Sequence, residues 1–148
     1  MSVGPTMGGY MSRIVALDVG DARIGVAATD ELGITVAPRK TVHRTVSVKD
    51  DIRIMLELLD NLDAEKVVIG YPVNEEGEEG PQAAKVKDFY DRLVRRLSIP
   101  VVLWDERFST QEAESQLLEM DLTRKQRLKV IDQMAAVIIL KSYLDENQ

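Results

Sequence analysis

Residues 13–29 read RIVALDVGDARIGVAAT, and this stretch sets how the fold begins. It contains two apolar runs, each with the length of a buried β-strand. Gly20 and Asp21 lie between the runs, so the spacing predicts an antiparallel hairpin. A weaker third strand is predicted over 34–42, where Pro38 favours a sheet edge or a strand end. The chain is therefore expected to open with three strands that are joined by hairpins.

The remainder of the chain alternates helical patterns with short apolar strands. Because each of the two later strands is reached through a helix, both should run parallel to the first strand. The whole pattern predicts an α/β fold with a mixed five-stranded sheet, three strands antiparallel and then two parallel, flanked by helices on both faces. The later predicted elements are a helix from Ser47, a strand over 66–70, a helix over 82–97, a strand over 100–104, and two helices that begin after Ser109 and Thr123.

Composition excludes several kinds of chemistry. The 148 residues include no cysteine and one histidine, His43. This excludes disulfides, thiolate nucleophiles and metal sites that need two imidazoles. A metal would have to be held by oxygen ligands, which favours Mg²⁺ or Mn²⁺. The net charge is −6, so binding to nucleic acid would need local basic patches.

The chain is expected to form one domain, over residues 13–146. Residues 1–12 are rich in Gly, Pro and Ser and are interpreted as a flexible leader. No apolar run approaches the length of a membrane span, and residues 1–12 lack the features of a signal peptide. The simplest location is the cytoplasm, with no membrane partner.

Three carboxylates occur where apolar residues are expected. Asp18 shares one face of the first strand with Ile14 and Ala16. Glu106 follows the apolar strand VVLW. Sites in α/β sheets lie at the carboxyl ends of strands, so Asp18 and Glu106 would meet if their strands are neighbours. Asp132 lies within the apolar stripe of the last helix and should point at the sheet.

Each of these acids also has a plain structural explanation. Asp18 could hydrogen-bond its own turn, Glu106 could form a surface ion pair with Arg107 or Arg23, and Asp132 could reach solvent from the edge of the stripe. Taken together, however, the three acids lie on elements that this architecture can bring to one point. Such a group fits a two-magnesium site, which activates water and stabilises the leaving oxygen in phosphodiester hydrolysis.

Four segments, in order, resemble the signatures of the YqgF family, also called RuvX. They are ALDVGDARIGVAATD (16–30), VVIGYPVNEEGEEG (67–80), VVLWDERFST (101–110) and VIDQMAAVIILKSYL (130–144). The family is described both as Holliday-junction resolvases and as pre-16S rRNA nucleases. The resemblance implies an RNase H-like fold, with Asp18, Glu106 and Asp132 as the metal-binding, catalytic acids.

The sequence leaves a fourth carboxylate open, and it departs from the family pattern in two places. Asp105 and Asp30 are the candidates for the fourth acid, although strand alternation points Asp105 to the opposite face. Asp21 stands where the family more often has a small hydroxyl or neutral residue. The loop 74–80 is more acidic than a phosphate-contacting loop should be, and its contact with substrate stays open.

The residues and the resemblance together predict a Mg²⁺- or Mn²⁺-dependent endonuclease in which Asp18 bridges two ions. Its expected substrate is structured RNA, with processing of the 5′ end of pre-16S rRNA as the expected activity. The alternatives are resolution of four-way DNA junctions and a non-catalytic RNA-binding role in ribosome assembly or transcription. A resolvase cuts two strands symmetrically and should be a dimer, whereas an RNA-processing enzyme can be a monomer. The cations expected to contact nucleic acid are Arg23, Arg107, Arg124, Lys125, Arg127 and Lys129.

A strand carrying Asp-x-Gly followed by a hairpin also occurs in actin-like nucleotide binders. A nucleotide-binding function is the least favoured interpretation, because the chain is too short for the two domains that those proteins close around a nucleotide.

Overall fold

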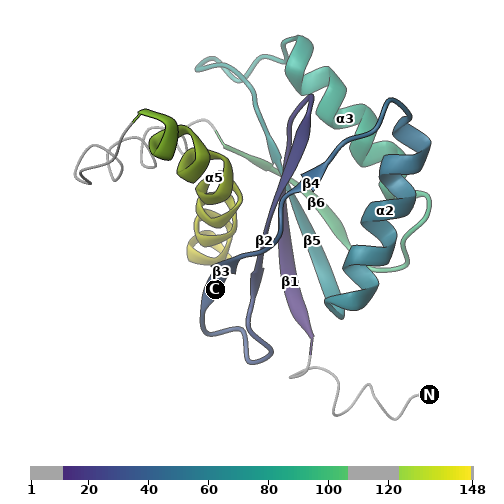
Figure 1. Ribbon diagram of the computed structural model, residues 1–148, viewed down its shortest axis with the longest axis vertical. Coiled ribbons are helices and arrows are strands. Elements are labelled where there is room, and N and C mark those ends of the chain that lie inside the picture. Colours follow the sequence, from purple (N-terminus) through teal and green to yellow (C-terminus); the bar gives the residue numbers. More distant parts are fainter. Residues whose placement is uncertain (1–11, 107–123, 148) are drawn as a thin grey trace.

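The protein folds around one sheet with helices on both faces (Figure 1). The computed structural model describes residues 12–106 and 124–147, with the side chains of the last helix described from residue 134 onward. The strands are β1 (Arg13–Val19), β2 (Arg23–Thr29), β3 (Val36–Pro38), β4 (Val42–His43), β5 (Ala64–Tyr71) and β6 (Val101–Asp105), and the helices are α2 (Val48–Asn61), α3 (Pro81–Val94) and α5 (Arg124–Glu146).

The sheet has the predicted mixture of directions. β1 and β2 form the antiparallel hairpin, and β5 and β6 continue the sheet parallel to β1. The strand order is β3-β2-β1-β5-β6, so β5 separates β1 from β6. The predicted strand over 34–42 is divided into β3 and β4, which both pair with β2, and the sheet therefore has six strands rather than five. β3 ends at Pro38 and lies at the edge of the sheet, as predicted.

The two faces of the sheet carry different cores. Leu17 of β1 faces a large apolar cluster with Met55 of α2 and Phe89 of α3. Ala16, one residue earlier, faces the opposite cluster, which includes Ile139 of α5. Strand alternation therefore places Asp18 on the same face as Ala16, under α5.

Local sequence explains where two helices begin. Ser47 caps α2 as predicted, because its side chain accepts a hydrogen bond from the Asp50 amide at 3.2 Å. α3 starts at Pro81, a residue suited to the first helical position. The helix predicted after Ser109 lies outside the described residues. None of the three helices that the structure describes is long and apolar enough to cross a membrane.

Candidate active site

Asp18 and Glu106 lie at the carboxyl ends of two strands that are not neighbours. The sequence predicted their meeting on the condition that β1 and β6 adjoin, and β5 lies between them instead. Gly70 of β5 pairs with Trp104 of β6, and the register of β1 with β5 brings Gly70 beside Asp18. Glu106 comes two residues after Trp104, so Asp18, Gly70 and Glu106 share the face that α5 covers.

Gly70 allows the Glu106 side chain to lie over β5. A Cβ atom built on Gly70 would collide with Oε2 of Glu106 and would lie 2.5 Å from Cδ1 of Ile139 on α5. A side chain at this position would therefore displace the Glu106 carboxylate and the end of the Ile139 side chain. Sequence reasoning missed Gly70, although a glycine inside the apolar strand VVIG is a known sign of close approach.

The environment of Glu106 disfavours its charged form. Burial, together with the negative charges of Asp18 and Asp105, raises the pKa of Glu106 from 4.5 to about 7. A dominant ion pair with a cation such as Arg23 would lower the pKa instead. The charged form of Glu106 is therefore costly near neutral pH, and a divalent cation bound beside it would lower that cost.

A cavity of about 120 Å³ opens beside Asp18. The turn from Gly20 to Arg23 and the side of Thr41 form its wall. Arg23 is exposed at the start of β2 and lines the same cavity as Asp18. Its contact with nucleic acid stays a prediction. Asp21, in the same turn, forms an ion pair with Lys85 of α3 at 3.2 Å.

The two candidates for a fourth carboxylate lie away from this cavity. Asp105 is exposed at the end of β6, and its position alternates to the face opposite Glu106. Asp30 lies at the far end of the β1–β2 hairpin from Asp18, where its Oδ1 accepts a hydrogen bond from the Ile34 amide at 2.7 Å. The hydrogen bond from the Ile34 amide lowers the pKa of Asp30, as expected for a carboxylate that stabilises a turn.

Asp132 lies on α5, and its side chain falls outside the described part. The helix runs antiparallel to β5, because Tyr143 accepts a hydrogen bond from Lys66 at the start of β5 and Ile139 meets Gly70 near its end. Residue 132 comes about two turns before Ile139, towards the end of the sheet at which β1 reaches Asp18. Its role as a ligand stays a prediction.

The other predicted contacts to nucleic acid also stay predictions. Arg107 lies outside the described residues, as do the side chains of Arg124, Lys125, Arg127 and Lys129 in the first turns of α5. Within the described side chains, no three His, Cys, Asp or Glu residues gather closely enough to hold a metal ion. Asp18 and Glu106 are thus two of the three predicted ligands, and their carboxylate oxygens suit a hard divalent cation.

A family model for RuvX, described as a Holliday junction resolvase, matches residues 12–146. The chain belongs to the RuvX family. The expectation from the four sequence motifs is therefore confirmed. Two relatives named "Putative pre-16S rRNA nuclease" are each 45% identical to this RuvX-family chain. The relative from Desulforudis audaxviator matches 92% of this chain and 96% of its own length, and the relative from Halothermothrix orenii matches 90% and 94%.

Solved structures confirm the fold. The RuvC of T. thermophilus in complex with a Holliday junction substrate has a TM-score of 0.54 at 14% identity, covering 91% of this chain and 96% of that one. The fowlpox virus Holliday junction resolvase has a TM-score of 0.54 at 11% identity, covering 92% and 99%. At such identities the likeness concerns the fold alone, and it agrees with the predicted RNase H-like architecture.

Proposed function

We propose that this RuvX-family chain is a divalent-metal-dependent endonuclease that hydrolyses phosphodiester bonds in structured nucleic acid. The observation that carries the proposal is the pair of Asp18 and Glu106 on one face of the sheet. The Glu106 carboxylate lies over Gly70, and the negative charge of Asp18 is near enough to raise the pKa of Glu106. Placing two carboxylates together in a partly buried site is costly unless a cation neutralises them. The names of the relatives and of the family model support a nuclease.

In this proposal Asp18, Glu106 and Asp132 hold Mg²⁺ or Mn²⁺, with room in the donor set for two ions. Bound ions of this kind activate water and stabilise the attacking and leaving oxygens of an in-line displacement. The carboxylates bind and orient, and Arg23 contacts a phosphate of the substrate beside Asp18. No protein nucleophile is required, which agrees with the absence of cysteine from the sequence.

We assign structured RNA as the substrate, in particular the 5′ end of pre-16S rRNA. The shared name of the relatives supports this choice. Arg107, Arg124, Lys125, Arg127 and Lys129 would hold the backbone near the acids. The nuclease domain would cover residues 13–146 and act in the cytoplasm, as a monomer or a homodimer.

Resolution of four-way DNA junctions is the second candidate. The description of the family model favours it, and both structural relatives named above are Holliday junction resolvases. This activity requires two sites that act on two strands, so it requires a dimer.

The deciding experiment compares cleavage of a pre-16S 5′-end RNA and of a four-way DNA junction, with Mn²⁺ and with a chelator. The wild type should cut one substrate in a metal-dependent way, and Asp18→Asn should lose cleavage while remaining folded. Glu57→Gln, an exposed acid on α2, is the matched control and should cleave as the wild type does. Well-folded wild type that binds RNA but cuts neither substrate would point to the non-catalytic adaptor.

A further inference from the structure

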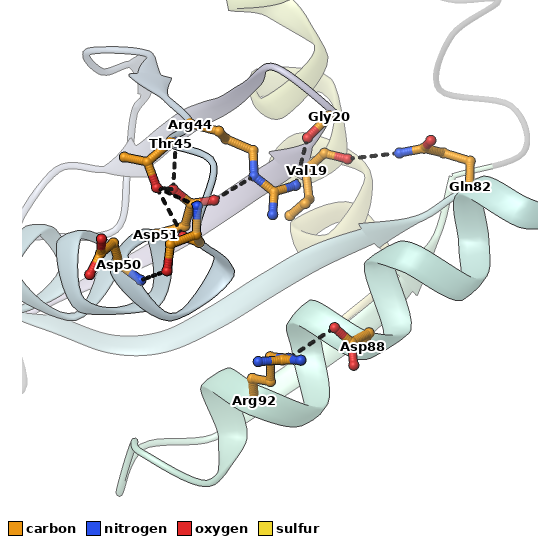
Figure 2. Close-up of polar contacts among 10 residues, drawn as sticks. Val19, Gly20, Arg44, Thr45, Asp50, Asp51, Gln82, Asp88 and Arg92 are labelled. Carbon is orange, nitrogen blue, oxygen red and sulfur yellow. Dashed lines mark hydrogen bonds and ion pairs between the residues drawn. The ribbon is translucent and has the colours of Figure 1, made fainter.

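A buried ion pair lies behind the turn that follows Asp18. Asp51, in the first turn of α2, is 1% exposed. Its Oδ2 accepts a hydrogen bond from Nε of Arg44 at 3.0 Å, and its Oδ1 accepts from the amide and the hydroxyl of Thr45 at 2.8 and 2.9 Å (Figure 2). Both oxygens of the carboxylate are therefore engaged, and the guanidinium of Arg44 is held in one orientation.

The other side of Arg44 faces the turn. Its Nη1 donates to the carbonyl oxygen of Gly20 at 2.8 Å, two residues after Asp18 (Figure 2). The preceding carbonyl, that of Val19, accepts from Nε2 of Gln82 at 3.4 Å. Two consecutive carbonyls after Asp18 are thus held by side chains from different parts of the chain.

Further contacts fix the arginine itself. Its backbone amide donates to the carbonyl of Ala22 at 2.9 Å, and its guanidinium lies 5.4 Å from the centre of the Phe89 ring. Burial opposes ionisation of Asp51, but the hydrogen bonds from Thr45 and Arg44 outweigh it and lower the pKa of Asp51. The Asp51 carboxylate is therefore ionised at neutral pH.

A buried ion pair is an inefficient source of stability, because desolvation of the two charges offsets much of their attraction. What the pair supplies is direction, because the planar guanidinium holds two acceptors in a fixed geometry, whereas the donors of a lysine ammonium rotate on a flexible stem. Here the two acceptors are a buried carboxylate and the backbone beside the proposed site.

We propose that Arg44, oriented by Asp51, is a positioning residue for the proposed nuclease reaction, because it fixes the Val19–Gly20 turn and thereby the carboxylate of Asp18. The Gly20 amide donates to the Arg23 carbonyl at 2.9 Å. By fixing Gly20, the hydrogen bond from Arg44 therefore also sets the start of β2. The inference rests on the proposed function and goes beyond it by assigning a role to the opposite face of the sheet.

The test is Arg44→Ala, with Arg92→Ala as the matched control. Arg92 pairs with Asp88 on α3, but these side chains are 47% and 58% exposed, whereas those of Arg44 and Asp51 are 14% and 1% exposed. Below the melting temperature of the variant, Arg44→Ala should lower kcat by about 100-fold, the scale of a misplacement of about 1 Å. KM should change by less than about threefold, because substrate-contacting groups are retained. Arg92→Ala should match the wild type.

Chemical rescue distinguishes positioning from stability. Arg44, Asp51 and Phe89 line a cavity of about 530 Å³, so truncation of the arginine leaves a path for a small cation. Methylguanidinium at millimolar concentration should restore cleavage by Arg44→Ala, because it can bond to Asp51 and Gly20 together. Methylammonium, which lacks the fork, should not.

Several results would overturn the proposal. One is folded Arg44→Ala with the kcat of the wild type, and another is lost activity that methylguanidinium does not restore. If Arg44→Ala does not fold, Arg44→Lys keeps the charge but lacks the rigid planar fork, and it must show the same loss of kcat. If the wild type cleaves nothing, the proposed function fails separately. The criterion is then the Mn²⁺ concentration that gives half of the maximal rise in melting temperature. Equal values for Arg44→Ala and Arg92→Ala would then refute positioning.

Discussion

Glu106→Gln should make the metal-free protein more stable at neutral and higher pH. A carboxyl whose pKa rises from 4.5 to about 7 on folding disfavours its charged form by about 3 kcal/mol, at about 1.4 kcal/mol for each pH unit. The folded state binds this proton more tightly than the unfolded state does. The free energy of unfolding therefore contains this contribution in full below pH 4.5 and loses it as the pH rises to about 7. Glutamine keeps the shape of the side chain without the charge.

The assay is urea denaturation of the wild type and of Glu106→Gln in the presence of a chelator, at several pH values between about 4.5 and 8. At about pH 8 the variant should exceed the wild type by 1–3 kcal/mol, the range reflecting a carboxylate that is only partly buried. At the acidic end the two proteins should be nearly equal, because Glu106 of the wild type is then protonated in the fold. Glu57→Gln, on the exposed face of α2, is the control and should show no such pH dependence.

The result that contradicts this reasoning is a difference between Glu106→Gln and the wild type that is the same at every pH. It would mean that the Glu106 carboxylate is stabilised by a cation of the protein or is solvated freely. The central argument for a cation site would then be lost, because the repulsion between Glu106 and Asp18 is what a bound cation would relieve.

Three further predictions concern the same region. Asp18→Asn should lower the pKa of Glu106 by removing one of its two negative neighbours, and a pH titration of Glu106 followed by carboxyl NMR checks this; an unchanged pKa would count against their proximity. Gly70→Ala should lower the free energy of unfolding by only about 1 kcal/mol, because the atoms it meets are ends of flexible side chains. It should nevertheless weaken the stabilisation by Mn²⁺ in a thermal melt. Full retention of that stabilisation would contradict the proposed role of Glu106. Asp51→Asn should remove a contribution to stability that the wild type has at neutral pH and loses as the pH falls through the lowered pKa of Asp51. In urea denaturation, the free energies of unfolding of the two proteins should therefore converge in acid. A difference that stays constant with pH would refute this.

The sequence was sufficient for the elements that local pattern determines. Apolar runs and the Gly20 turn predicted the β1–β2 hairpin, and the Ser47 cap predicted the start of α2. These features depend on neighbours along the chain, which a single sequence displays. The division of 34–42 into two strands was missed, because a weak edge strand is determined by its pairing with β2.

What the sequence could not supply was strand order and the contacts that follow from it. Nothing local indicates that β5 lies between β1 and β6, so the need for a glycine at position 70 could not be derived. Asp51 was equally hidden, since an acid in the first turn of a helix is ordinarily an exposed residue that complements the helix dipole. Only the fold shows that this acid is buried beneath Arg44.

The two faces of the sheet have different proposed roles at the end of β1. On the α5 face, Asp18 and Glu106 stand close together at an electrostatic cost that a cation can offset. On the opposite face, Arg44 and Asp51 hold the backbone that follows Asp18, and they do so with charges of opposite sign that satisfy each other. A like-charged pair repels and tends to move apart, so it needs a rigid support if it is to bind an ion at a fixed position. This reasoning links the buried ion pair to the proposed chemistry: the stronger the repulsion at the site, the more the turn behind it has to be held.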